Sequence, residues 1–309
     1  MKFNLSNTAI PFMSARIGGF IFSAILIILS FGSFFYSGLN FGIDFKGGTL
    51  IEIETADEVN LADIRSNLNL LSLGDVQVQE FGSTKNILIR VEQQAGGDNV
   101  QQNVVELVKA SLDKNITTSI SYRRTEVVGP KVSGELIQSG IIAIAVAVIA
   151  MLIYIWFRFE WQFSLGAVIA LVHDVILTIG VFCFTQLEFN LPIIAAILTI
   201  VGYSMNDTVV VYDRVRENLR KHRSKPIIEL LDLSINETLS RTVITSVTTL
   251  LALVSLYIFG GSVIKGFTFA MIWGVVVGTY SSIFVASPFL KYVDVKRDWD
   301  TTSAVDSTK

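Results

Sequence analysis

Six apolar stretches constrain this chain more than any other feature, because each is near the length of about 20 residues that a bilayer requires. Lipid offers no partners for backbone N–H and C=O groups, so a spanning segment of this composition must be helical. The sequence therefore predicts a multi-pass α-helical membrane protein with six transmembrane helices. The six stretches are 17–36, 137–156, 164–184, 191–212, 242–259 and 267–290.

Composition agrees with a membrane protein, since 51% of the 309 residues are hydrophobic and only 17% are charged. The formal net charge of -3 gives no sign of a nucleic-acid partner, which would require a basic surface. A signal-peptide core is shorter than the first stretch, at about 7–15 residues. We therefore expect residues 17–36 to be an uncleaved membrane helix.

Lysine and arginine residues predict the orientation, because they accumulate in cytoplasmic loops. Placing the N-terminus inside also places Arg158, the basic segment 213–241 and the tail 291–309 inside. The opposite orientation would export the richest basic cluster. We expect both termini, a loop at 213–241 and a polar tail at 291–309 to be cytoplasmic.

The polar segment 38–136 is large enough for a small domain outside the cytoplasm. Alternating and helical apolar patterns follow one another in the order βαββαβ, which is typical of a ferredoxin-like α+β unit. Gly96 and Gly97 divide its halves. The predicted organisation is 1–37 with helix 1, 38–136 as the outer domain, 137–290 as a five-helix bundle, and 291–309 as the tail.

Asp207 is the strongest candidate for a functional residue, because it lies in the fourth apolar stretch. A carboxylate there costs about 2.5–3.5 kcal/mol on insertion scales, and such residues commonly mark ion or proton pathways. Tyr203, Ser204 and Asn206 lie within one helical turn and can hydrogen-bond either form of the acid. The alternative is a static, paired carboxylate with a structural role.

Arg241 precedes the fifth apolar stretch, and Thr245 and Thr248 follow it near helical spacing. A helix face with a guanidinium and hydroxyl groups is a suitable partner for Asp207. The alternative is that the threonines allow close helix packing and that Arg241 anchors the helix at the membrane surface.

His173 and Asp174 lie near the middle of the third stretch. Adjacent helical residues point about 100° apart, so at most one should face Asp207 squarely. His173 can relay protons near neutral pH, whereas a polar clasp between helices is the alternative. Asp213 is a further pathway candidate, although its position at the membrane edge is more typical of an anchor.

Other motifs indicate packing or exclude chemistry. Gly274 and Gly278 form a small-xxx-small pattern that permits close helix approach. The segment 45–48 lacks the frame of a nucleotide-binding loop. Two histidines, one of them His222 in the basic segment, do not suggest a metal site. We expect no cofactor, and protons rather than a nucleotide as the energy source.

Several motifs resemble those of the SecD/SecF family, the auxiliary membrane subunits of the bacterial Sec machinery within the resistance-nodulation-division superfamily. The segment 41–49 contains Gly42, Asp44, Gly47 and Gly48 of the family motif. The remaining matches are 128–130, the His173–Asp174 pair, 202–214 and 236–242. The resemblance runs from about residue 41 to the end of the sixth stretch.

The resemblance implies a translocase subunit of the bacterial inner membrane that uses the proton-motive force to promote late steps of polypeptide export. SecD, the SecYEG channel, YajC, the exported polypeptide and membrane lipid are the implied partners, without nucleic acid. The family's essential aspartate and its partner arginine correspond to Asp207 and Arg241. Whether sodium replaces the proton stays open. The alternatives are a passive scaffold for SecYEG and half of a lipid or small-molecule pump.

Overall fold

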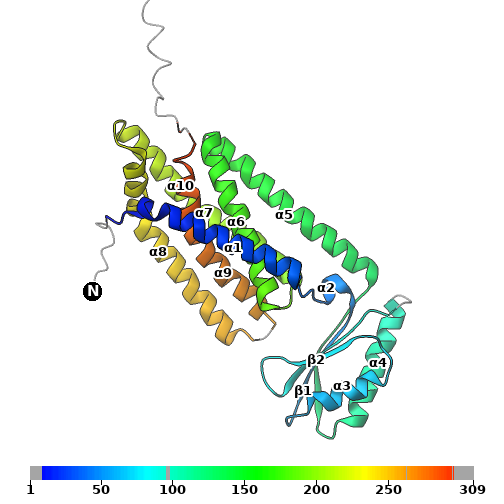
Figure 1. Ribbon diagram of the computed structural model, residues 1–309. Helices are drawn as coiled ribbons and strands as arrows, with labels where there is room; N and C mark the ends of the chain where they lie inside the picture. The colour runs from blue at the N-terminus through cyan, green and yellow to red at the C-terminus, as the bar shows by residue number, and fades with distance from the viewer. Residues whose placement is uncertain (1–8, 95–97, 262, 294, 296–309) are drawn as a thin grey trace, which may run out of the picture.

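The computed structural model describes residues 9–94, 98–261, 263–293 and 295. It consists of a helical bundle with a small sheet domain at one end (Figure 1). The predicted divider at Gly96–Gly97 and the tail from residue 296 onward lie outside the described residues.

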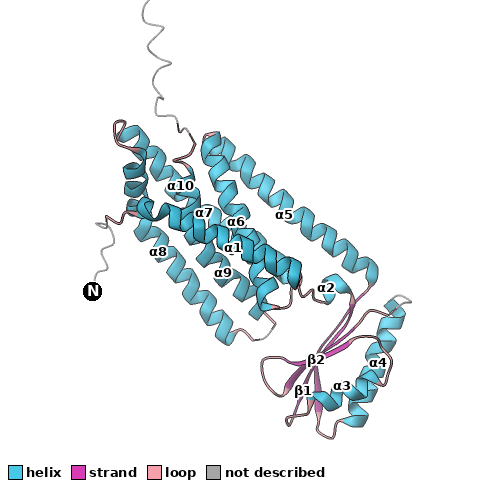
Figure 2. Cartoon of the chain, in the orientation of Figure 1, coloured by secondary structure: helices cyan, strands magenta, loops and turns pink. Residues whose placement is uncertain are grey.

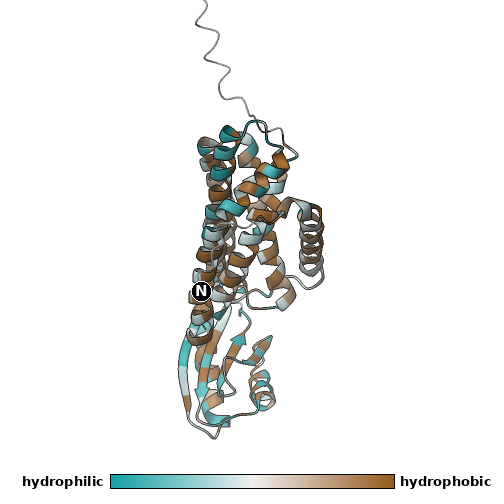
Figure 3. Cartoon of the chain, turned by 90° about the vertical axis from the view of Figure 1, so that its left-hand side faces the viewer, coloured by the Kyte–Doolittle hydropathy of each residue, from teal (hydrophilic) through white to brown (hydrophobic). Residues whose placement is uncertain are grey.

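Six helices are long and apolar enough to cross a membrane, which confirms the predicted number among the described residues. All strands in the described part of the chain lie in the sheet domain (Figure 2). Hydrophobic residues dominate the bundle, and hydrophilic residues gather at its far end and across the sheet domain (Figure 3). The helices are α1 (Arg16–Tyr36), α5 (Pro130–Arg158), α6 (Trp161–Thr185), α7 (Leu191–Lys221), α8 (Ile227–Phe259) and α9 (Lys265–Ser281), which continues through a π-helical turn, η3 (Ser282–Ala286), into α10 (Ser287–Phe289).

Two of these helices extend well beyond the predicted spans and give the loop at 213–241 a helical form. α7 continues to Lys221 and α8 already begins at Ile227. Hydropathy averaged along the chain misses these turns because their charges lie on one face and their apolar residues on the other. The buried apolar residues are Val215, Leu219, Leu230, Leu231 and Ile235.

The sheet domain has the predicted βαββαβ order. Its four antiparallel strands lie in the order β2-β3-β1-β4, so the small ferredoxin-like sheet is confirmed. The elements are α2 (Ile43–Lys46), β1 (Gly48–Thr55), α3 (Leu61–Asn69), β2 (Val76–Glu80), β3 (Asn86–Val91), α4 (Asp98–Asn115) and β4 (Ile120–Val128).

Period-two alternation divides the sheet into two faces. Ile51 and Ile53 of β1 are fully buried with the apolar side chains of α3 and α4. Leu50 and Leu88 belong to a separate small cluster with Ile43 on the opposite face. One face of the sheet therefore holds the domain core, and the other carries the apolar group next to α2.

The bundle contains two apolar cores that meet near its middle. One lies toward the sheet domain and includes Phe182, Ile193, Ile197, Ile200 and Met271. The other lies toward the far end and includes Phe163, Leu171, Val201, Met205 and Ile283. On α6, α7 and α9, polar residues occur where one core gives way to the other.

The small residues of α9 bring this helix close to α7, as the sequence predicts. A Cβ atom added at Gly274 would collide with Ile200, and one added at Gly278 would lie 2.9 Å from the Ser204 Cβ. Close approach therefore positions the polar residues of α7 and α9 within hydrogen-bonding distance of a common partner.

The segment that precedes α1, from Ile10 to Met13, is held against α8 by side chains. The Met13 N–H donates to Asp232 Oδ1 over 2.8 Å. Asn236 exchanges two hydrogen bonds with the backbone of Ile10, at 3.0 and 2.9 Å. These bonds satisfy N–H groups at the short helix η2 (Phe12–Ala15) that leads into α1.

Replacing Gly48 by alanine is expected to destabilise the sheet domain. Gly48 has φ +115°, and an added Cβ would collide with the Val91 carbonyl oxygen. Strain of this kind costs about 1–3 kcal/mol. Thermal unfolding of the purified protein should show a lower midpoint for Gly48→Ala. Gly134→Ala is the control, because nothing lies within 4 Å of that position in α5. Equal midpoints for the two variants would contradict this account.

Candidate functional site

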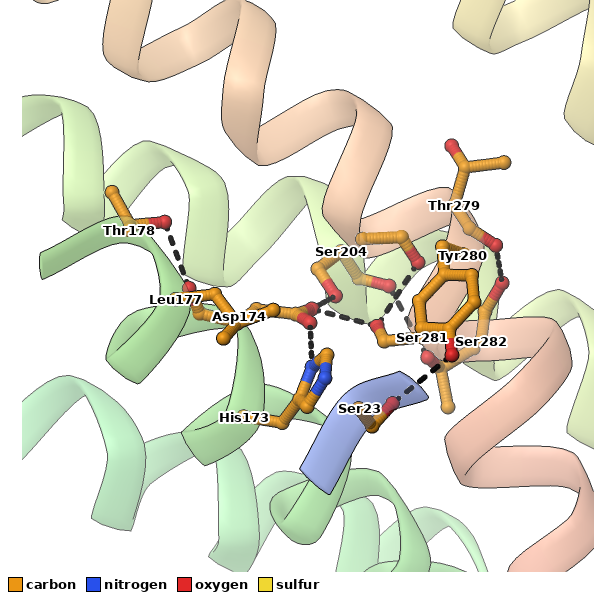
Figure 4. Close-up of polar contacts among 12 residues, drawn as sticks. Ser23, His173, Asp174, Leu177, Thr178, Ser204, Thr279, Tyr280, Ser281 and Ser282 are labelled. Carbon is orange, nitrogen blue, oxygen red and sulfur yellow. Dashed lines mark hydrogen bonds and ion pairs between the residues drawn. The ribbon is translucent and has the colours of Figure 1, made fainter. Parts of the chain in front are cut away.

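A buried polar layer crosses the middle of the bundle and joins three helices. Asp174 of α6 is only 1% exposed, and Ser204 of α7 and Ser281 of α9 are equally enclosed. Figure 4 shows their side chains converging with that of His173. A polar group in such surroundings requires hydrogen-bond partners, because leaving it unpaired costs several kcal/mol in lipid.

The Asp174 carboxylate uses both of its oxygens. Oδ1 lies 2.9 Å from His173 Nδ1. Oδ2 accepts hydrogen bonds from Ser204 Oγ at 2.5 Å and from Ser281 Oγ at 2.8 Å. The acid therefore clasps α6, α7 and α9 at one level of the bundle. This arrangement is the polar clasp that the sequence left open as an alternative to a relay.

His173 extends the polar layer toward α1. Its ring stacks on Tyr280 with the centroids 6.2 Å apart. The Tyr280 hydroxyl donates to the Gly19 carbonyl at 2.8 Å and lies 3.1 Å from Ser23 Oγ. His173 Nε2 is buried and has no hydrogen-bond partner among the described residues. A relay through this ring would have Asp174 at one nitrogen and an open position at the other.

Asp207 differs from Asp174 although it is 4% exposed and similarly buried. Its Oδ2 has no hydrogen-bond partner within the described part of the chain. Arg241 and Asp207 form no direct ion pair among the described residues. Asp207 can therefore accept a proton on Oδ2 without breaking a hydrogen bond at that oxygen.

Of the polar neighbours predicted for Asp207, only Ser204 lies in the buried layer, and it donates to Asp174. The Tyr203 hydroxyl donates to Thr249 Oγ1 of α8 at 3.4 Å. Asn206 is exposed on the surface of the single chain. The three residues thus point in three directions from α7.

The two threonines predicted on the Arg241 face of α8 bond to their own helix. Thr245 Oγ1 donates to the Arg241 carbonyl at 3.0 Å, and Thr248 Oγ1 donates to the Ile244 carbonyl at 2.8 Å. Arg241 and Thr248 are exposed in the single chain. The predicted polar face of α8 therefore exists, and part of it is open on the surface of the bundle.

Asp213 lies apart from this layer. It forms an ion pair with Arg158 at 2.9 Å, and both side chains are nearly half exposed. It follows Asp207 by six positions in α7, which is about 9 Å along the helix. Its surroundings are those of an anchor at the helix end. Across the described residues, no three His, Cys, Asp or Glu side chains gather in a way that could hold a metal ion.

Sequence reasoning missed the contribution of α9. Ser281 and Tyr280 complete the layer, and Thr279 Oγ1 bonds to Ser246 Oγ of α8 at 2.8 Å. A signal was present, because Ser281 continues the spacing of Gly274 and Gly278 by about one more turn. The π-helical turn that follows is a second unpredicted feature, and such turns frequently occur at functional sites.

The motif containing Gly42, Asp44, Gly47 and Gly48 is not part of the polar layer. It lies where the sheet domain meets the loop between α6 and α7. Gly47 and Gly48 have φ values of +73° and +115°, which glycine adopts readily. These residues shape the turn from α2 into β1.

Two family models match the chain. The C-terminal model of the protein export membrane proteins SecD and SecF matches residues 108–296, and the SecD/SecF GG motif matches residues 32–59. The second match covers the turn at Gly47 and Gly48.

Curated relatives match nearly the whole chain. A protein translocase subunit SecF from Cereibacter sphaeroides is 46% identical over 96% of this chain and 93% of its own length. The SecF subunit of Rickettsia rickettsii is 47% identical over 90% of each chain. That of Desulfurispirillum indicum is 46% identical over 92% of this chain and 91% of the relative.

Solved structures share the fold. A crystal structure of SecDF, a translocon-associated membrane protein from Thermus thermophilus, aligns with a TM-score of 0.83 at 35% identity. The alignment covers 93% of this chain and 39% of the longer SecDF chain. SecDF in a super-membrane-facing form aligns with a TM-score of 0.66 at the same identity, over 90% and 38% of the two chains.

Replacing Ser204 by alanine is expected to loosen the polar clasp. The change removes one of two donors from Asp174 Oδ2, and hydrogen bonds between membrane helices contribute about 0.6–1.7 kcal/mol. The midpoint of thermal unfolding in nanodiscs should fall. Thr199→Ala is the matched control, because Thr199 lies on α7, is exposed, and bonds only to its own helix. A fall of equal size in both variants would argue against the clasp.

Proposed function

The chain belongs to the SecD/SecF family of protein export membrane proteins, and from this premise we propose that it uses the proton-motive force to promote late steps of polypeptide export. The family membership makes it an auxiliary subunit of the Sec machinery, associated with SecD. What we propose beyond this membership is that the chain couples proton movement to export and that it acts late in translocation.

The observation that carries the proposal is the free oxygen of Asp207 inside a six-helix bundle. An acid in this position can bind and release a proton, whereas Asp174 has partners on both oxygens. A proton that crosses the membrane releases about 2.3 kcal/mol per 100 mV. A change of about 1.4 kcal/mol alters an equilibrium constant tenfold. The energy of one proton is therefore sufficient to shift a conformational equilibrium constant by a factor above ten.

In the proposed cycle, Asp207 alternates between its ionised and protonated forms. Ionisation strengthens its attraction to Arg241, and protonation removes that attraction. α7 and α8 then change their packing, while the Asp174 clasp holds α6, α7 and α9 together as a unit. His173 and Asp174 lie next to the proposed proton pathway. A proton relay through His173 would continue from Nε2, which has no hydrogen-bond partner among the described residues.

The exposed faces of the bundle support association with a second set of helices. Only 6%, 11% and 17% of the most apolar stretches of α1, α5 and α8 are buried within the chain. An apolar face can be covered by lipid alone. Asn206, Arg241 and Thr248, however, are polar residues exposed on α7 and α8. Such residues normally face protein or water rather than lipid. SecD is the proposed partner for this face.

The proposed orientation places both termini in the cytoplasm and the sheet domain in the periplasm of a bacterial inner membrane. The basic residues at the end of the bundle opposite the sheet domain support it, because positive charge accumulates on the cytoplasmic side. In this orientation the sheet domain meets the polypeptide as it leaves SecYEG. YajC is proposed as a further component of the same assembly.

Asp207→Asn is expected to abolish the proton-dependent part of export, because an amide cannot cycle between charged and neutral forms. The measurement is translocation of a model preprotein into inverted vesicles that contain equal amounts of each variant and its SecD partner. Glu217→Gln is the control, because Glu217 lies on α7 but is exposed and pairs with Arg214. Proton-dependent export at the normal level in Asp207→Asn would refute the proposal.

Collapse of the proton gradient separates this function from that of a passive scaffold. A protonophore should reduce export in vesicles with the unchanged chain to the level seen with Asp207→Asn. A scaffold would support the same export with and without the gradient. That result would leave Asp207 as a structural carboxylate.

A further inference from the structure

The joint between the sheet domain and the bundle is built from the segment at residues 40–44 and the loop between α6 and α7. Phe41 and Phe189 form an isolated parallel β-bridge. The Phe189 N–H donates to the Asn40 carbonyl, and the Gly42 N–H donates to the Phe189 carbonyl, both at 2.8 Å. Two segments almost 150 residues apart in the sequence thus share backbone hydrogen bonds.

Asp44 adds a charged contact to this joint. Its Oδ2 accepts a hydrogen bond from the N–H of Leu191, the first residue of α7, at 2.7 Å. The first N–H groups of a helix have no partner within the helix, and a negative charge there is favourable. Asn190, the residue in the N-cap position, makes no capping bond with its own side chain. The side-chain cap of α7 is therefore supplied by the sheet side of the joint.

A second polar link runs from the sheet itself. Arg90 of β3 forms an ion pair with Glu188 at 2.8 Å, and its guanidinium also donates to the Phe41 carbonyl at 3.4 Å. Both charged side chains are partly buried. The strand that carries Arg90 is thereby connected to the same loop that leads into α7.

Aromatic rings from both sides of the joint pack against one another. Phe41, Phe45 and Phe189 contact one another with ring centroids 5.8–6.1 Å apart, and Phe182 of α6 lies 5.8 Å from Phe189. A Cβ added at Gly42 would lie 2.6 Å from Glu188 Oε1. A movement of the start of α7 must therefore displace the motif segment as well.

The helix held by this joint is the one that carries Asp207. Asp207 follows Leu191 by sixteen positions, which is about 24 Å along a continuous helix. The sheet domain has a separate attachment, because β4 passes into α5 with only Gly129 between them. A shift of α7 relative to α5 would therefore tilt the sheet domain about its connection to α5.

We propose that Asp44 is a positioning residue that couples α7 to the sheet domain, so that a displacement of α7 at Asp207 is transmitted to the domain. This inference rests on the proposed function, in which the charge of Asp207 changes the packing of α7. Asp44 acts through the Leu191 N–H and has no part in proton transfer. The Arg90–Glu188 pair supports the same connection.

The test measures the position of the sheet domain in the full chain, in complex with its SecD partner in nanodiscs. Spin labels are placed at Asp63→Cys on α3 and Phe157→Cys at the far end of α5, both exposed positions, with Cys183→Ala to remove the native thiol. Double electron–electron resonance measures the distance between the labels in two proteins. One retains Asp207 and is measured at high pH, and the other is Asp207→Asn, which imitates the protonated form. The expected result is a shift between the two distance distributions.

Asp44→Leu should abolish that shift, because leucine cannot accept the Leu191 hydrogen bond. Asp44→Asn should retain it, because the amide oxygen is still an acceptor. Glu106→Leu is the control, since Glu106 is an exposed acid on α4 away from the joint. Proton-dependent export should be lost in Asp44→Leu and retained in Asp44→Asn and Glu106→Leu. A role in stability alone would lower protein levels without removing the shift in the protein that accumulates.

The outcomes separate this inference from the proposed function. An unchanged shift in Asp44→Leu, with export still lost in Asp207→Asn, would overturn the role of Asp44 alone. Proton-dependent export that survives Asp207→Asn would overturn the proposed function and the coupling with it. Should Asp44→Leu not accumulate, Arg90→Gln removes the other polar link. The shift should then be reduced, and an unchanged shift would count against the coupling.

Discussion

The clasp of Asp174 by Ser204, Ser281 and His173 is the interaction on which the bundle depends. Helices in lipid gain little from burying apolar surface against one another, so polar bonds and close packing determine which faces meet. The clasp lies where two apolar cores adjoin, and glycines on α9 allow the approach that it needs. A single carboxylate therefore holds α6, α7 and α9 at one level of the bundle.

The same bundle gives its two buried acids opposite surroundings. Asp174 has partners on both oxygens, and such an acid is suited to hold helices together. Asp207 keeps a buried oxygen that has no hydrogen-bond partner among the described residues. An unpaired polar atom in a membrane is costly. In the proposed cycle this oxygen is the one that takes up and releases the proton.

α7 links this site to the sheet domain. It carries Ser204 of the clasp and Asp207 in its middle, and its first N–H is capped by Asp44 from the sheet side. Because a helix is stiff along its axis, a displacement of α7 at Asp207 would also displace its first residue at the joint. The residues of the family motif therefore have two structural tasks. Gly47 and Gly48 shape the turn into β1, and Asp44 caps the first residue of α7.

The sequence alone determined the six membrane helices and the βαββαβ order of the sheet domain, and it singled out Asp207 as a candidate, because apolar length, period-two alternation and a carboxylate in an apolar run are local signals. It also contained the pattern of Gly274 and Gly278. Only the tertiary structure decided that Ser204 serves Asp174, that α9 supplies Ser281, and that Asp44 caps α7. These choices depend on which faces of distant helices meet, and neither spacing nor composition records that.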